Sequence, residues 1–230
     1  MATIAAIVAA ISMIVVGGGT AVAAPQTGEM FLTFVRHGES AGNASGLVDS
    51  SVPGPHLTAK GQAQAAAVAQ LLADRKFDGV YASTMIRTQE TAAPTSALRH
   101  LPVVVEPGVR EIEAGDYEGT PEKDALATYF QAPLQWMQRN FAPRIPGSID
   151  GYEFMNRMNA AIKDIQNRGS KRPVVFSHGG AIMVWVMAAV SNPNLGLMKS
   201  DPLNNTGHVV VKGSPEKGWK LIEWDGKSAA

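Results

Sequence analysis

Two histidines, His37 and His178, each follow an apolar run typical of a buried strand, and each is followed by glycine. The runs cover residues 31–35 and 173–176, and Arg36 separates the first from its histidine. A histidine can act as nucleophile or base, and an arginine fork suits phosphate or carboxylate. Either pair alone could be an ordinary surface loop, but two in one sheet are difficult to attribute to packing. The sequence therefore indicates an anion-binding crevice with a reactive imidazole.

Other polar residues follow predicted strand ends and are expected in the same crevice. Arg87 lies shortly after the short strand 79–82, and Asn43 lies five residues beyond Gly38. Ligands of open α/β sheets bind at the carboxyl ends of the strands, so both side chains could act as donors there. Gly38 would let a ligand approach the backbone closely. The alternative for Arg87 is a surface pair with Glu90, three residues further along a helix.

An acidic loop could supply a proton to a leaving group. Residues 111–118 contain four carboxylates next to two glycines, the only such concentration in the chain. If the backbone there is extended, Glu111 and Glu113 point the same way, so spacing alone does not choose between them. A solvated acidic turn without any chemistry is the other interpretation.

Strands and helices must alternate to position these residues. Apolar runs predict six strands, at residues 31–35, 79–82, 103–105, 173–176, 209–211 and 219–224. The last of these is predicted to close a terminal hairpin. Helical spacing of apolar residues predicts one helix after Thr58, a plausible N-cap, and another over residues 152–168. A third helix is predicted at residues 181–190. Pro94 predicts that the helix after residue 84 is interrupted there or has this proline in an early turn. The alternation favours an α/β fold with βαβ units.

Composition restricts the class of partner. The 230 residues, 45% hydrophobic and 17% charged, can form a proper core, and the length favours one domain. Lys plus Arg equals Asp plus Glu at 20 each, so no global field attracts nucleic acid, and we expect no nucleic-acid partner. The absence of cysteine excludes disulfides, thiolate metal sites and a cysteine nucleophile. The oligomeric state stays open.

The amino terminus predicts export. Residues 4–16 are apolar apart from Ser12, and Ala21-Val22-Ala23 has the small-x-small pattern that favours cleavage before Ala24. No Lys or Arg lies near Met1, which is atypical for such a signal. Uncleaved, residues 4–24 could span a bilayer, which takes about 20 residues, or form a buried helix. We expect residues 1–23 to be a signal peptide or membrane anchor and the protein to be secreted or in the cell envelope.

The assembled motifs resemble the histidine phosphatase superfamily, also called phosphoglycerate mutase-like, over about residues 31–224. Five separated motifs carry the resemblance, at 36–40 with Asn43, 57–65, 83–91, 110–112 with Gly115, and 177–180. Their order along the chain matches that of the family. Residues 148–151, Ser-Ile-Asp-Gly, replace a Gly-Glu-Ser that many members carry, so substrate specificity is not carried over there.

The resemblance implies a three-layer α/β/α sandwich with a mostly parallel central sheet over residues 24–230. It implies that His37 is the phosphorylated nucleophile and that Glu111 is the general acid. It also implies a phosphate clamp of Arg36, Arg87 and His178. The chemistry of a phosphoryl group agrees with this clamp, since a charged imidazole at His178 and the amides at the start of the 181–190 helix would stabilise its oxygens. Neither a metal nor a cofactor is required.

Asn43 and Gly179 are predicted to bind substrate in that crevice. Residues 116–150, which contain Trp136, are predicted to form a lid or substrate-specifying insertion, with a plain packing layer as the alternative. The sequence therefore predicts an exported, metal-independent phosphomonoester hydrolase of the histidine acid phosphatase type, acting on a small-molecule or other phosphomonoester. A phosphoglycerate-type mutase and a catalytically silent phosphate-ester binding protein are the alternatives.

Overall fold

The computed structural model describes residues 28–229, apart from the Met198 side chain. The predicted export segment, including its cleavage site before Ala24, lies outside the described residues. Within residues 28–229, no helix combines the length and the apolar character that a membrane crossing requires.

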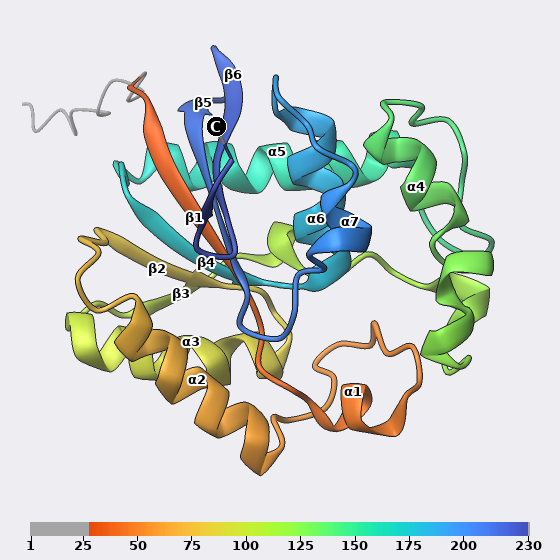
Figure 1. Ribbon diagram of the computed structural model, residues 1–230, viewed down its shortest axis with the longest axis horizontal. Coiled ribbons are helices and arrows are strands. Elements are labelled where there is room, and N and C mark those ends of the chain that lie inside the picture. Colours follow the sequence, from red (N-terminus) through yellow and green to blue (C-terminus); the bar gives the residue numbers. More distant parts are fainter. Residues whose placement is uncertain (1–27, 230) are drawn as a thin grey trace, which may run out of the picture.

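A seven-stranded sheet forms the centre of the fold, in the order β3-β2-β4-β1-β5-β6-β7 (Figure 1). The first four strands pair in parallel, whereas β5, β6 and β7 pair antiparallel along the other side of β1. The strands are β1 Met30–Arg36, β2 Gly79–Ala82, β3 Val103–Val105, β4 Pro173–Ser177, β5 His208–Ser214, β6 Gly218–Trp224 and β7 Lys227–Ser228. All six predicted strand segments are therefore confirmed.

Helices cover both faces of the sheet, which makes the predicted three-layer sandwich (Figure 1). The α-helices are α1 Ala41–Ser45, α2 Ala59–Leu71, α3 Ile86–Arg99, α4 Gln131–Met137, α5 Gly151–Asn167, α6 Gly179–Ala189 and α7 Leu197–Ser200. Three 3-10 helices are η1 Pro107–Val109, η2 Gly115–Tyr117 and η3 Glu122–Ala127. The pair α2 and α3 lies on one face, and α5 and α6 lie on the other.

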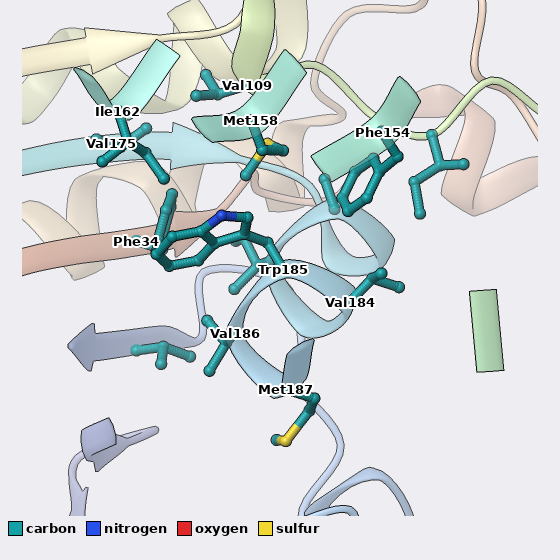
Figure 2. Close-up of a cluster of buried hydrophobic side chains, with 14 of the residues drawn as sticks. Phe34, Val109, Phe154, Met158, Ile162, Val175, Val184, Trp185, Val186 and Met187 are labelled. Atoms are coloured by element: carbon teal, nitrogen blue, oxygen red, sulfur yellow. The ribbon is translucent and has the colours of Figure 1, made fainter. Parts of the chain in front are cut away.

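Alternation along β1 builds one core on each face of the sheet. Leu32 and Phe34 belong to the larger cluster with α5 and α6, and Val35 belongs to the smaller cluster with α2 and α3. In the larger cluster the Trp185 ring of α6 packs against Phe34, with 5.4 Å between the ring centroids (Figure 2). Burial on both faces explains the near-continuous apolar run of this strand.

Local signals explain most helix boundaries, with one exception. Thr58 is the N-cap of α2 and accepts a hydrogen bond from Gly61 N at 3.0 Å, as predicted. Asp150 and Glu153 form a capping box at the start of α5. The predicted interruption at Pro94 is wrong, because α3 runs through this residue. Ala92, two residues before Pro94, is fully buried in the sheet-facing core. Packing therefore maintains the helix although Pro94 has no backbone N–H to donate.

Three parallel strands deliver their next residues to one edge of the sheet. Arg36 pairs with Ser177 in the β1–β4 register, and Ala82 pairs with Phe176 in the β2–β4 register. His37, Ser83 and His178 are the residues that follow these strands. The carboxyl edge of the parallel half therefore brings the chemistry-bearing residues together, as expected.

Candidate active site

His37 is buried at the end of β1 and presents an unprotonated ring nitrogen. Its Nδ1 donates a hydrogen bond to the Gly38 carbonyl at 2.6 Å, so Nε2 is the nitrogen that carries the lone pair. Arg87 Nε donates a hydrogen bond to this Nε2 at 3.2 Å. Burial, and then the neighbouring Arg87 and Arg36, hold the pKa of His37 well below its usual value. This low pKa favours a neutral imidazole whose lone pair lies on Nε2.

Two glycines allow the His37 loop to pack against α2. A Cβ on Gly38 would lie 2.6 Å from the Gly61 carbonyl oxygen, and a Cβ on Gly61 would lie 2.0 Å from the Glu39 carbonyl oxygen. Either contact is too close for two heavy atoms. The predicted role of Gly38, room for a ligand, is wrong, because the backbone of α2 occupies that space.

Arg87 and Arg36 each keep a buried donor without a hydrogen-bond partner among residues 28–229. These donors are Nη1 of Arg87 and Nε of Arg36. Besides the hydrogen bond from Arg87 Nε to His37, Arg87 Nη2 donates to the Asp49 carbonyl at 3.1 Å and Arg36 Nη1 donates to the Leu203 carbonyl at 2.8 Å. Burial is the main cause that lowers the pKa of both guanidinium groups. Two buried, under-satisfied cations next to His37 are suited to an anion.

The surface alternative for Arg87 is wrong. Glu90, its proposed partner, instead contacts His56 Nδ1 at 2.6 Å and accepts a hydrogen bond from Leu57 N at 2.8 Å. Arg87 itself is only 3% exposed. It belongs to the crevice.

His178 is completely buried and lies beside His37, with ring centroids 5.1 Å apart. Its Nε2 is 2.8 Å from Ser83 Oγ, whereas its Nδ1 has no partner among the described residues. Burial, and then Arg87 and His37, hold its pKa well below the usual value. This low pKa favours a neutral imidazole, in contrast to the charged His178 of the prediction.

Glu111 and Glu113 lie in different surroundings. The Glu111 carboxylate accepts hydrogen bonds from Ile112 N at 2.9 Å, Ala181 N at 2.7 Å and Gly180 N at 3.1 Å. Glu113 instead pairs with Arg110, whose Nε donates to it at 2.9 Å. Only Glu111 lines the pocket described below.

The N-terminal amides of α6 are engaged by this carboxylate. The predicted role of these amides, direct anion binding, does not fit the structure, because Gly180 N and Ala181 N donate to Glu111. The negative carboxylate occupies the favourable end of the helix dipole instead. The helix terminus therefore positions Glu111 at the crevice.

Asn43 lines the pocket, whereas Gly179 does not. Asn43 Oδ1 accepts hydrogen bonds from Ser40 N at 3.2 Å and from Asn205 Nδ2 at 3.3 Å. A Cβ on Gly179 would lie 3.2 Å from Arg36 Nε, so this glycine leaves room for the arginine. The structure thus places Asn43 where a ligand could reach it and gives Gly179 a packing role.

Sequence reasoning missed two residues that hold the site together. Ser83 contacts His178 through its hydroxyl, and Asn205 Nδ2 donates to the His37 carbonyl at 3.0 Å. The position of Ser83, directly after β2, was an available signal. Asn205 precedes β5, on the antiparallel side of the sheet, and only the β1–β5 pairing brings it near.

These residues surround a pocket of about 110 Å³. His37, Arg87 and Glu111 contribute to it, together with the loop after α1 and the segment around η3. The predicted insertion, residues 116–150, thus supplies part of the pocket through Glu122, Ala125, Tyr129 and Phe130. The pocket therefore combines an imidazole, a guanidinium group and a carboxylate.

Comparison with known proteins identifies the family of this chain. The family model described as histidine phosphatase superfamily (branch 1) matches residues 32–226. The chain belongs to the histidine phosphatase superfamily. Its structure resembles the native structure of a mycobacterial glucosyl-3-phosphoglycerate phosphatase, with a TM-score of 0.68 and 22% identity over 86% of this chain and 100% of that chain. At this identity the likeness shows the fold.

Two relatives illustrate the range of similar sequences. The chain is 40% identical over 211 residues to the PE-PGRS family protein PE_PGRS11 of Mycobacterium tuberculosis (strain ATCC 25618 / H37Rv), covering 85% of this chain and 36% of that protein. It therefore spans about a third of that relative's length. It is 29% identical over 168 residues to the adenosylcobalamin/alpha-ribazole phosphatase of Escherichia coli (strain K12), covering 71% of this chain and 81% of the relative. Phosphatases among the relatives support phosphoester hydrolysis as the class of activity.

Proposed function

We propose that this chain hydrolyses phosphomonoesters through a covalent phosphohistidine on His37 Nε2, without a metal ion. The observation that carries the proposal is a neutral His37 whose Nε2 faces Arg87, in a pocket that also contains the Glu111 carboxylate. An unprotonated imidazole is the form that can attack phosphorus. Because the pKa of His37 is lowered, this form persists at mildly acidic pH, which supports a histidine acid phosphatase type of activity.

The reaction proceeds in two balanced steps, before which the Glu111 carboxylate takes up one proton from solvent as the substrate binds. His37 Nε2 attacks phosphorus, the bond to the ester oxygen breaks, and Glu111 gives this proton to the departing alkoxide. Water then attacks the phosphohistidine, Glu111 takes a proton from that water, and the bond between nitrogen and phosphorus breaks. Inorganic phosphate leaves, and His37 is neutral again.

Unpartnered donors stabilise the charge that develops on the phosphoryl oxygens. The free N–H groups of Arg36 and Arg87 can donate to these oxygens without first breaking another hydrogen bond. His178 can add a donor at Nδ1 if Ser83 donates its hydroxyl proton to Nε2. Before the attack, Arg87 Nε must turn from His37 Nε2 to a phosphoryl oxygen, which frees the Nε2 lone pair.

Trapping the intermediate tests the proposal. The mature protein is mixed with labelled phosphomonoester and quenched in alkali, in which phosphohistidine survives. Label should appear on His37, disappear in His37→Ala and remain in His100→Ala, a control at an exposed histidine. Chelator should change none of this.

Other outcomes identify the alternatives. Transfer of the label mainly to an added phosphoglycerate would favour the mutase. Tight binding of a phosphate ester without labelled protein or phosphate release would favour the silent binder. Activity that is lost with chelator and restored by a divalent ion would refute the metal-independent mechanism.

We also propose that the protein is exported, with cleavage before Ala24, which the apolar start and the Ala21-Val22-Ala23 pattern support. Amino-terminal sequencing of protein from the medium or cell envelope should give Ala24 or a close neighbour. Recovery of only full-length protein from the cytosol would contradict this.

A further inference from the structure

The outer walls of the pocket come from two segments that are hydrogen-bonded to each other. Val48 N donates to the Thr120 carbonyl at 2.8 Å, and Glu122 N donates to the Gly46 carbonyl at 2.8 Å. Figure 1 shows this loop after α1 beside the segment that leads to α4. The pairing holds Glu122, which is exposed, and Leu47, which is 43% exposed, at the mouth of the pocket.

An aromatic ring lies next to the predicted proton donor. A Cβ on Gly180 would lie 2.8 Å from Glu111 Oε1 and 3.3 Å from Phe130 Cε2, so both groups surround one point. Phe130 also contacts the ring of Tyr129, whose hydroxyl donates to the Ile112 carbonyl at 2.6 Å. Because the proton donor must contact the ester oxygen, the carbon attached to that oxygen should lie against Phe130.

The charged groups around the mouth of the pocket are negative. Glu122 and Asp49 line the pocket, and among the described residues Arg87 is its only lining lysine or arginine. Glu122 lies close enough to Arg36 to interact with it electrostatically. Burial lowers the pKa of Arg36, and the negative charge of Glu122 partly opposes this effect. A bound phosphate would use the two arginines. A second anionic group on the substrate would face carboxylates without a compensating cation.

The neighbouring cations are engaged elsewhere or lie outside the pocket lining. Arg110 pairs with Glu113, and Lys60 pairs with Glu39. Arg139 donates to carbonyls near the end of α6. Within the described part of the chain, Lys123 is exposed next to Glu122 but does not line the pocket.

We infer that this site takes phosphomonoesters whose alcohol has an apolar surface next to the ester carbon and carries no second negative charge. This inference rests on the proposed function. It selects uncharged or cationic alcohols over carboxylated or doubly phosphorylated ones. A phosphoglycerate, which bears a carboxylate close to its phosphate, falls outside this class.

Three aryl phosphates of similar size and leaving-group acidity test the inference. They are phenyl phosphate, 4-(aminomethyl)phenyl phosphate and 4-carboxyphenyl phosphate, which differ in charge at the far end of the ring. We expect kcat/KM of the wild type to be at least about tenfold lower for the carboxylated ester than for the other two. Glu122→Lys should raise the ratio of kcat/KM for the carboxylated ester to kcat/KM for phenyl phosphate by on the order of tenfold. This is the size expected for the interaction of unit charges near a partly solvated surface.

A matched control uses Asp124→Lys. Asp124 lies on the same 3-10 helix and is exposed, but it does not line the pocket. This variant should leave the ratio close to that of the wild type. Phe130→Ala should lower kcat/KM for phenyl phosphate more than for methyl phosphate, whose alcohol is too small to cover the ring.

The outcomes separate this inference from the proposed function. If the carboxylated ester is the best substrate, or if both lysine variants change the ratio equally, the inference is wrong, whereas normal labelling of His37 would leave the proposed function intact. If none of the three esters is hydrolysed and His37 is never labelled, the proposed function fails and the inference fails with it.

Discussion

Replacing Glu111 by glutamine should separate its chemical role from its structural role. The carboxylate accepts three backbone N–H groups at 2.7–3.1 Å, two of them from the first turn of α6. A glutamine has only one acceptor oxygen. If that oxygen keeps the Ile112 and Ala181 donors, the amide nitrogen faces Gly180 N–H, a contact between two donors.

The cost of that conflict can be estimated. An unsatisfied buried N–H costs about 1–3 kcal/mol, and loss of negative charge at the helix N-terminus adds about 0.3–1 kcal/mol. Glu111→Gln should therefore lower the free energy of unfolding by about 1–4 kcal/mol. Urea unfolding monitored by circular dichroism measures this change.

The catalytic loss should depend on the leaving group. A general acid contributes about 10²–10⁴-fold, and this contribution is lost only where the leaving oxygen needs a proton. Glu111→Gln should therefore lower kcat/KM, which reports the phosphorylation step, by that factor for β-glycerol phosphate and little for p-nitrophenyl phosphate. Hydrolysis of the phosphohistidine, in which Glu111 activates water, should slow equally with both esters. Glu113→Gln is the matched control, because Glu113 pairs with Arg110 and does not line the pocket. Equal losses of kcat/KM on both esters in Glu111→Gln, or a selective loss in Glu113→Gln, would refute the assignment.

Three further predictions follow from the buried groups of the site. Arg87→Ala should lower turnover by about 10²-fold or more, as loss of one preorganised donor does. Thermal unfolding should show nearly unchanged stability, because removal of an under-satisfied buried cation offsets the loss of the hydrogen bonds to Asp49 and His37. Near-normal turnover in a folded variant would contradict this. Ser83→Ala should lower the free energy of unfolding by about 1–3 kcal/mol in urea titrations, because it leaves His178 Nε2 buried without a partner; wild-type stability would exclude this role. Folding lowers the pKa of His37 and of His178, so below about pH 6.5 the unfolded chain binds more protons than the folded protein. The free energy of unfolding should therefore decrease as the pH falls below this value, by up to about 1.4 kcal/mol per pH unit for each histidine. His178→Gln should reduce this dependence of the unfolding free energy on pH by up to about 1.4 kcal/mol per pH unit, the contribution of one proton, whereas His100→Gln should leave it unchanged. Equal pH dependence in the wild type and both variants would disprove the assignment.

Some features could be read from the sequence because their causes are local. Strands buried on both faces require continuous apolar runs, so β1 and β4 were visible as such. Thr58 could be assigned as a cap because a cap acts within three residues of itself. Residues that directly follow parallel strands reach one edge of the sheet, so the neighbourhood of His37, Arg87 and His178 was predictable from strand order alone.

Other features depend on contacts between distant segments. Only the approach of residues 110–113 to α6 distinguishes Glu111 from Glu113, because their local patterns are equivalent. The partner of Gly38 is the backbone of α2, and the partner of His37 O is Asn205 beyond the β1–β5 pairing. No periodicity within one segment contains these contacts.

The sequence alone determined the α/β class, the strands and the set of reactive residues, since side-chain periodicity and residue type are properties of short segments. The tertiary structure decided the protonation and the hydrogen-bond roles of those residues. Burial next to two arginines makes His178 neutral, and the Glu111 carboxylate takes the helix amides that could have bound an anion. Desolvation and long-range hydrogen bonds control both outcomes, and they exist only when the chain is folded.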